Sequence, residues 1–215
     1  MERPRAGNVP AVATGYTGRA ARRLIAGGTP MFRHFPARAF PLFALAAALA
    51  VVAGAPRAEV VDASRNGFTT RASVVIEAPR AAVYRAATGR LPAWWIDDHT
   101  VSGNASNLTL DAVPQGCLCE NLGQGGGVVH LTVTFVSPGT MLRLTGALGP
   151  LGLLGTSGNL VWEFEDAGQA TRVTWTYVVG GYAPGGLEKM AAAVDGMLAA
   201  QLASLKAFVE KDHPG

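Results

Sequence analysis

Both cysteines of the chain and one of its four histidines lie in a single short stretch, GCLCENLGQGGGVVH, at 116–130. Thiolates and imidazoles are the preferred ligands of zinc, and two nearby cysteines can form a disulfide in an oxidising compartment. A histidine near a carboxylate such as Glu120 could also transfer protons. The stretch therefore raises three possible chemistries: a metal site, a redox-active bridge and an acid–base site.

The glycine-rich centre of this stretch predicts a β-hairpin. A turn centred on Gly125 would pair Cys119 with Leu131 and Glu120 with His130. Because side chains alternate along a strand, one face of the hairpin would then be apolar and carry Cys117, Cys119, Leu131, Val133 and Phe135. The other face would carry Glu120 and His130.

This register separates the thiols from the imidazole, so we expect no metal site. We interpret Cys117 and Cys119 as buried thiols that act as small apolar wall residues. A strained or redox-active bridge is the alternative, since residues two apart on a strand have Cα atoms about 6.6 Å from each other, at the edge of disulfide geometry. We expect Glu120 and His130 to form a surface pair, with a proton-transfer role as the alternative.

Two further segments could do chemistry. Asp97-Asp98-His99 could bind a divalent ion, but we interpret it as a solvated loop. The glycine-rich segment 180–186 could gate an entrance or form a plain turn. The sequence shows no Ser-His-Asp series, no paired carboxylates in a plausible cleft strand and no phosphate-binding loop. We therefore assign no catalytic residues, no metal and no cofactor, and favour a protein that is not an enzyme.

The elements that must position these residues follow from hydrophobic periodicity and turn signals. Short β-branched or alternating runs predict strands at 68–76, 108–113, 117–122, 128–136, 140–148, 159–165 and 172–179. A short helix is expected at 80–88, after Pro79. Apolar residues at spacings of three and four from Leu187 to Phe208 predict a long amphipathic helix. The fold class is therefore α+β, with a curved antiparallel sheet of about six to seven strands around a C-terminal helix.

The amino-terminal part differs from the rest in charge and hydropathy. Residues 1–58 carry eight Arg and one Glu, whereas residues 59–215 carry ten Lys or Arg and fourteen Asp or Glu. The basic charge therefore lies outside the predicted domain, which argues against a nucleic-acid partner. Met31 opens a basic segment, and an uncharged apolar segment follows at 39–55, the order of a secretory signal peptide.

These features give a domain plan. Residues 1–30 are a disordered extension or a misassigned upstream start, 31–58 a signal peptide, 59–67 a short linker, 68–211 the domain and 212–215 a tail. Ala53-Gly-Ala55 has the small residues of a cleavage site, but Pro56 follows and would hinder processing, so cleavage after Ala58 is the alternative. We expect a periplasmic or secreted bacterial protein; the alternative is a membrane anchor formed by an uncleaved leader.

Particular residues carry a resemblance to a known superfamily. They are Val75-Ile-Glu-Ala-Pro79, Trp94-Trp95, Trp162-Glu-Phe164, Thr174-Trp-Thr-Tyr177 and Val194-Asp195-Gly196. The chain resembles the helix-grip fold of the START, polyketide-cyclase and SRPBCC superfamily, in the branch of the activator of heat-shock-protein-90 ATPase. The resemblance covers 68–211 and implies an apolar cavity between the sheet and the long helix.

We expect this cavity to hold a small apolar or lipid-like molecule; the oligomeric state is left open. The expected lining residues are Trp94, Trp95, Cys117, Cys119, Leu131, Val133, Trp162, Trp175, Tyr177, Met190, Val194 and Met197. For the aromatic residues, an ordinary filled core is the alternative. A polyketide-cyclase-like enzyme that uses His130, Glu120 or Tyr177 is the second function considered. A chaperone-associated interaction module, implied by the branch name alone, is the third.

Overall fold

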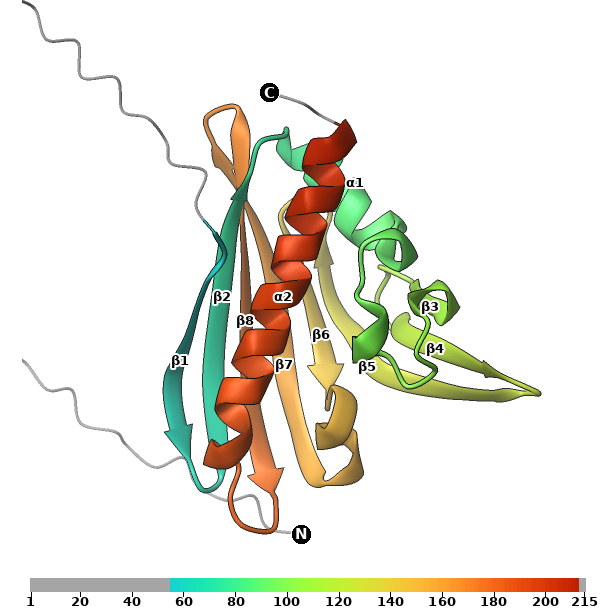
Figure 1. The fold of residues 1–215 in the computed structure, drawn as a ribbon, viewed down its shortest axis with the longest axis vertical. Coiled ribbons are helices and arrows are strands. Elements are labelled where there is room, and N and C mark those ends of the chain that lie inside the picture. Colours follow the sequence, from blue (N-terminus) through green and yellow to red (C-terminus); the bar gives the residue numbers. More distant parts are fainter. Residues whose placement is uncertain (1–54, 213–215) are drawn as a thin grey trace, which may run out of the picture. The chain divides into compact units, whose positions relative to one another are not determined.

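A single antiparallel sheet of eight strands organises the domain (Figure 1). The structure is a computed structural model that describes residues 55–212; the expected extension, nearly all of the expected signal peptide and most of the tail lie outside these residues. The strands are β1 (Arg57–Ser64), β2 (Gly67–Ile76), β3 (Leu108–Leu110), β4 (Cys117–Gly123), β5 (Gly126–Ser137), β6 (Met141–Gly146), β7 (Gly155–Ala167) and β8 (Ala170–Tyr182). Their order across the sheet is β1-β2-β8-β7-β6-β5-β4-β3.

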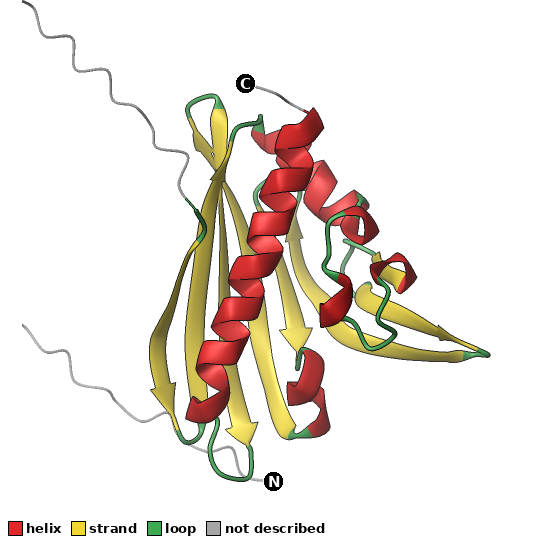
Figure 2. Ribbon diagram, in the orientation of Figure 1, coloured by secondary structure: helices red, strands yellow, loops and turns green. Residues whose placement is uncertain are grey.

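Two α-helices and four short 3-10 helices complete the described part (Figure 2). They are α1 (Arg80–Gly89), η1 (Leu91–Ala93), η2 (Asp97–His99), η3 (Ala105–Asn107), η4 (Gly149–Leu153) and α2 (Glu188–Asp212). The sheet curves, and α2 crosses one of its faces. The predicted α+β class and helix-grip arrangement are confirmed.

The long helix α2 runs alongside β2. Near its start, the Leu187 amide donates to the Arg65 carbonyl at 3.0 Å. Near its end, Lys206 Nζ donates to the Val75 carbonyl at 2.7 Å, and the Glu77 amide donates to Glu210 Oε1 at 2.8 Å. By length and composition alone α2 could cross a membrane, but its leucines pack against the sheet, so it is the core helix of the domain.

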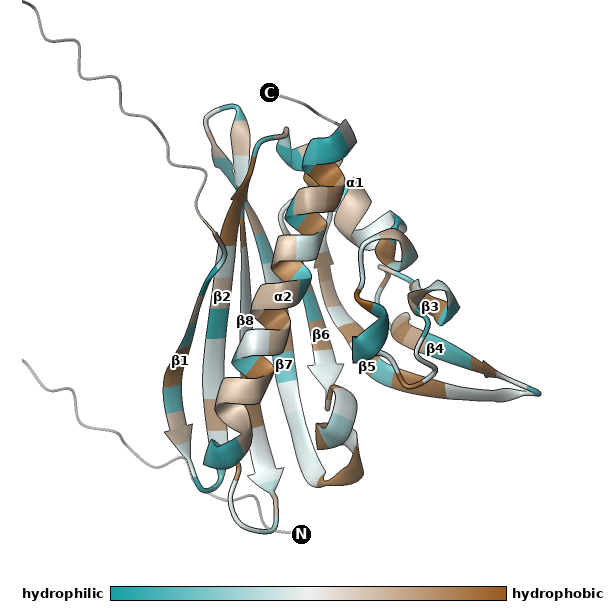
Figure 3. Cartoon of the chain, viewed as in Figure 1, coloured by the Kyte–Doolittle hydropathy of each residue, from teal (hydrophilic) through white to brown (hydrophobic). Residues whose placement is uncertain are grey.

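The core lies between the inner face of the sheet and α2. Apolar side chains alternate with polar ones along β2, β7 and β8, so one face of each strand is apolar, and bands of apolar residues follow the strands and α2 in Figure 3. The largest fully buried side chains include Trp162, Trp175, Tyr177, Phe68 and Phe164. Burying one such side chain contributes about 1.5–3 kcal/mol, so this inner face accounts for much of the stability.

Strand β1 was not anticipated from the sequence, which led us to expect a linker at 59–67. All eight residues of Arg57–Ser64 are exposed, so the segment carries no hydrophobic alternation that could reveal a strand. It forms by pairing with β2 at the edge of the sheet, with a bulge between Val60 and Asp62. The sheet therefore begins at residue 57 and not at 68.

Candidate functional site

The β4–β5 hairpin folds in a different register from the predicted one. Gly123 pairs with Gly126 across a two-residue turn, where Gln124 and Gly125 have φ of 51° and 82°. Turns with positive φ at both central residues suit the twist of a hairpin, so this turn is one residue shorter than the turn centred on Gly125 that we expected. Two register shifts follow the turn, one between Asn121 and Gly123 and one between Leu118 and Cys119, and beyond them Leu118 pairs with Leu131.

This register reverses the predicted faces of β4. Leu118 and Glu120 are buried, whereas the alternating residues Cys117 and Cys119 lie on the opposite face and are only half-buried. The prediction that both cysteines share the inner face with Leu131 and Val133 is therefore wrong. The sulfurs are also bonded to each other, so the expected free thiols are replaced by the alternative, a disulfide.

A bulge in β5 brings His130 inside. Leu118 pairs with Leu131 and Cys119 with Val129, so His130 has no partner and is the extra residue of the bulge. Such bulges re-aim side chains. His130 is 8% exposed and Glu120 is 2% exposed, and His130 Nε2 lies 2.8 Å from Glu120 Oε2. The expected surface pair is therefore a buried pair.

Glu120 also holds the loop between η2 and η3. The backbone amides of Val101 and Ser102 donate to its two carboxylate oxygens at 3.0 and 2.5 Å. Burial alone would raise the pKa of Glu120, but hydrogen bonds from Ser102, Val101 and His130 outweigh burial and lower the pKa to about 2. An ionised carboxylate with this many donors is a strong acceptor that fixes the imidazole and the loop together.

Three tryptophans meet on the inner face. Trp162 of β7 and Trp175 of β8 are register partners, and their rings stack at 4.5 Å with planes 11° apart. The ring of Trp94 lies 6.3 Å from Trp162 and 6.1 Å from Trp175. The structure thus brings together three of the predicted lining residues; we call them the tryptophan cluster.

The hydrogen bonding of the four tryptophans divides them into two pairs. Trp94 Nε1 donates to the Ala86 carbonyl at 3.1 Å, and Trp95 Nε1 donates to the His99 carbonyl at 3.2 Å. Trp162 Nε1 and Trp175 Nε1 are buried and have no acceptor among the described residues, and the buried hydroxyl of Thr70 has no partner either. Nearly all buried donors in proteins are paired, so these three groups require an explanation.

The Tyr177 hydroxyl uses both its donor and its acceptor capacity in hydrogen bonds to the backbone. Its hydroxyl donates to the Gly146 carbonyl at 3.0 Å and accepts from the Leu148 amide at 3.0 Å. Burial raises the pKa of Tyr177 to about 12, although the bond from Leu148 opposes this shift. A fully bonded hydroxyl with this pKa is a poor general acid at neutral pH.

The remaining predicted lining residues fall into two sets. Trp95, Leu131 and Val133 are buried, with exposed fractions of 1–5%. The α2 residues Met190, Val194 and Met197 are partly buried and pack against the core. In the glycine-rich segment 180–186, residues 180–182 belong to the end of β8, where Tyr182 is 73% exposed.

The segment Asp97–His99, after the tryptophan pair, forms the 3-10 helix η2, and its side chains hydrogen-bond to neighbouring elements. Asp97 Oδ1 accepts from the Ala105 amide at 2.7 Å, and His99 Nδ1 lies 2.8 Å from Gln201 Nε2 of α2. The described residues contain no group of three or more His, Cys, Asp or Glu side chains that could hold a metal ion.

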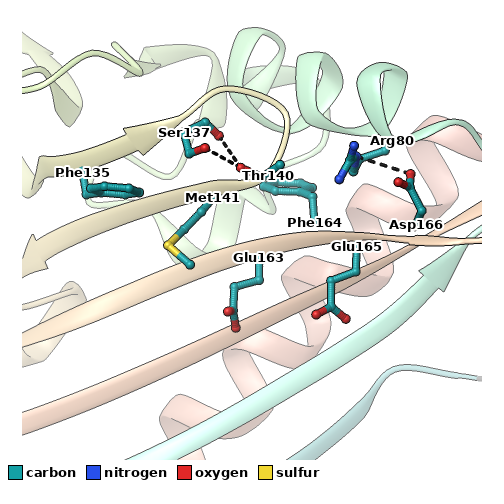
Figure 4. Close-up of a pocket in the computed structure, with 9 residues that line it drawn as sticks. All are labelled: Arg80, Phe135, Ser137, Thr140, Met141, Glu163, Phe164, Glu165 and Asp166. Atoms are coloured by element: carbon teal, nitrogen blue, oxygen red, sulfur yellow. Dashed lines mark hydrogen bonds and ion pairs between the residues drawn. The ribbon is translucent and has the colours of Figure 1, made fainter.

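Two surface hollows lie away from the expected cavity. The first, of about 560 Å³, is lined by Arg80, Phe135, Ser137, Thr140, Met141, Glu163, Phe164, Glu165 and Asp166 (Figure 4). In it, Arg80 Nε lies 3.3 Å from Asp166 Oδ1. The second, of about 540 Å³, lies between α1 and the end of α2 and is lined in part by Phe208 and Arg90. Neither hollow includes a residue of the predicted lining.

Comparison with solved structures supports the fold. An uncharacterized protein from Rhizobium leguminosarum superposes with a TM-score of 0.50 and 20% identity, covering 73% of this chain and 98% of its own. CalU16 from Micromonospora echinospora superposes with a TM-score of 0.51 and 13% identity, covering 74% and 89%. A conserved protein of unknown function from Enterococcus faecalis gives 0.50 and 13%, covering 71% and 77%. At these identities the likeness shows the fold alone.

Comparison with curated protein sequences gives no significant match. The family profile described as polyketide cyclase / dehydrase and lipid transport matches residues 67–210, more than half of the chain and nearly the whole described domain. This match confirms the superfamily that the sequence resembled, whereas the finer branch stays a prediction. The chain belongs to the polyketide cyclase / dehydrase and lipid transport family.

Proposed function

We propose that the protein binds a small, largely apolar molecule between the sheet and α2, beside the tryptophan cluster. The observation that carries this proposal is the pair of buried indole N–H groups, on Trp162 and Trp175, that find no acceptor in the described part of the chain. Leaving a buried donor unpaired costs about 1–3 kcal/mol, so a chain that keeps two of them on neighbouring strands gains from an acceptor supplied there.

The surrounding side chains define the ligand class. The inner face around the cluster is apolar, which favours a ligand that buries mostly hydrocarbon or aromatic surface. The two indole N–H groups and the Thr70 hydroxyl favour one or two oxygen acceptors on that ligand, such as carbonyl or hydroxyl groups. A flat molecule with a few oxygens fits this combination better than a bare alkane.

For a ligand to enter, α2 must move away from the sheet. The two halves of α2 differ in the contacts that hold them to the rest of the domain. The carboxyl-terminal half is hydrogen-bonded to β2, its following loop and η2 through Lys206, Glu210 and Gln201. In the amino-terminal half, the residues that face the core include Met190 and Met197, which are only partly buried. Methionine adapts its shape easily, so this half is the side on which we place the ligand entrance.

The binding test uses the purified full-length chain and two probes, a hydroxyanthraquinone and a long-chain fatty acid. Quenching of tryptophan fluorescence reports occupation of the cluster. We expect saturable binding of the quinone, weakened by about 1–2 kcal/mol or roughly tenfold when W175F removes one donor. The matched variant W94F removes a donor that is already bonded, and should leave affinity nearly unchanged. Absence of saturable quenching by both probes would contradict the proposal.

A second function is supported by a different observation. Glu120 and His130 are buried and lie 2.8 Å apart, within the hydrogen-bond reach that general acid–base catalysis uses. If the protein catalyses a ring closure, H130A should abolish product formation while leaving quinone affinity unchanged. Equal loss of both would indicate that the pair only supports the fold.

Export stays a proposal of its own. The apolar segment 39–55 and the disulfide both fit an oxidising compartment. Cleavage after Ala55 would leave β1 whole, whereas cleavage after Ala58 would remove Arg57 and Ala58, which pair with Ser73 and Ala72. We therefore propose cleavage after Ala55. Amino-terminal sequencing of the periplasmic protein from an expressing bacterium tests this, and a mature chain that begins at Glu59 would exclude it.

A further inference from the structure

The disulfide and the bulge occupy the same level of the β4–β5 ladder. Cys117 pairs with Thr132 and Cys119 with Val129, so three residues of β4 face four residues of β5. The bridge joins the first and last of these three residues on the half-buried face. The fourth residue of β5 is accommodated by the bulge at His130.

The bridge also shortens β4 at this level. The Cα atoms of Cys117 and Cys119 lie 5.3 Å apart. Two residues of an extended strand span about 6.6 Å, so the bridged segment is contracted by roughly 1.3 Å. The contraction of β4 and the extra residue in β5 both increase the difference in length between the paired segments, because each makes β4 shorter than β5 at this point.

We infer that the Cys117–Cys119 disulfide is a redox-sensitive latch that holds His130 in the bulge and beside Glu120. Without the bridge, β4 can extend, the mismatch that the bulge absorbs becomes smaller, and the imidazole is no longer forced to the inner side. Glu120 would then keep the amides of Val101 and Ser102 but lose His130.

The bridge contributes little as a simple cross-link. It closes a loop of three residues, and the stabilisation from restricting the unfolded chain grows with loop length. The domain core lies on the other face, around the tryptophan cluster, and does not depend on the sulfurs. Opening the bridge should therefore change the hairpin locally and leave the domain folded.

The reaction is thiol–disulfide exchange with a dithiol. A thiolate of the dithiol attacks one sulfur of the bridge, and the other sulfur leaves as a thiolate. The second thiolate of the dithiol then attacks the dithiol sulfur of the mixed disulfide, and the remaining cysteine sulfur leaves as a thiolate. The bridge gains two electrons and two protons, and the dithiol loses them and becomes a disulfide. Both cysteines are half-buried, not enclosed, so a thiol can reach them.

The test measures His130 accessibility in the full-length chain with and without dithiothreitol. Diethyl pyrocarbonate modifies exposed imidazoles, and peptide mapping separates His130 from the exposed His99, which serves as an internal control. After reduction, confirmed by alkylation of both thiols and mass spectrometry, we expect His130 to react at least about tenfold faster, because the rate follows the open population. The rate at His99 should not change.

Variants separate the latch from general destabilisation. The double variant C117A/C119A should show the fast His130 rate with or without dithiothreitol. The control variant N121A/Q124A alters the same hairpin without touching the bridge and should behave like the parent chain. An unchanged His130 rate in the fully reduced chain, or loss of tryptophan fluorescence and circular dichroism that shows unfolding of the whole domain, would overturn the inference.

Discussion

Two regions of this domain bury polar groups in opposite ways. In the hairpin of β4 and β5, Glu120 receives hydrogen bonds from two backbone amides and from His130, so its buried charge is fully engaged. In the tryptophan cluster, the indole N–H groups of Trp162 and Trp175 have no acceptor within residues 55–212. A network whose hydrogen bonds are all formed favours a single structure. Unpaired donors can instead form hydrogen bonds with a bound ligand.

The difference assigns different roles to the two sites. The Glu120–His130 pair stabilises the hairpin and the loop at 101–102, so substitutions of Glu120 should lower the free energy of unfolding. The tryptophan cluster is where a ligand can gain hydrogen bonds, and substitutions of its donors should affect binding more than stability. Each substitution below tests that division.

The largest effect is expected from E120A. This substitution leaves the buried His130 without its carboxylate partner and removes the acceptor of the Val101 and Ser102 amides, and breaking a buried charged network in this way costs about 3–5 kcal/mol. Urea unfolding followed by circular dichroism measures the loss. The control is E165A, an exposed glutamate of β7, which should change the free energy of unfolding by less than about 0.5 kcal/mol. A similarly small change for E120A would show that the network adds nothing to stability.

Protonation of Glu120 at low pH should weaken the same hydrogen-bond network and lower the free energy of unfolding. The folded-state pKa is about 2 and the ordinary value is 4.5, so ionised Glu120 stabilises the folded state at pH values above 4.5. This contribution, on the order of 3 kcal/mol, is lost as the pH falls from about 4.5 to about 2. Unfolding free energies measured across this range should fall less steeply in E120Q than in the parent chain. Parallel curves would contradict the assignment.

The sequence predicted the frame of the fold better than the orientation of the candidate site. The sheet was identified by hydrophobic alternation along β2, β7 and β8, and α2 by the periodicity from Leu187 to Phe208. These patterns are clear because one face of each element packs against the core and the other faces solvent. The hairpin was misjudged because one residue in turn length moves every side chain to the other face. Gln124-Gly125, a pair that can adopt positive φ, was the available signal.

Two other features could not be read from the residues. Strand β1 is exposed along its whole length and is defined only by pairing with β2, which leaves no trace in hydropathy. The bulge at His130 is a property of two strands together, so no pattern within 126–137 reveals it. The unpaired donors of the tryptophan cluster likewise depend on which carbonyls lie nearby in the fold.

A pair of identical substitutions isolates the contribution of the indole donors. W94F and W175F remove the same atoms from two buried rings of the cluster. W94F also leaves the Ala86 carbonyl without its donor, whereas W175F removes a donor that had no acceptor. The loss of unfolding free energy should therefore be larger for W94F, by about 1–2 kcal/mol. Equal losses in urea unfolding would mean that the Trp175 donor is satisfied in solution, and would weaken the binding proposal.

The smallest effect concerns the helix that covers the cluster. Gly196 lies inside α2, and a Cβ added there would meet no atom within 4 Å. Because glycine is a poor helix former, G196A should stabilise the domain by about 0.5–1 kcal/mol. The control G168A places a side chain at φ +76° in the β7–β8 turn, so it should destabilise the domain. If α2 must loosen to admit a ligand, G196A should also slow quinone uptake in stopped-flow fluorescence. An unchanged uptake rate in a measurably stabilised G196A chain would place the entrance away from α2.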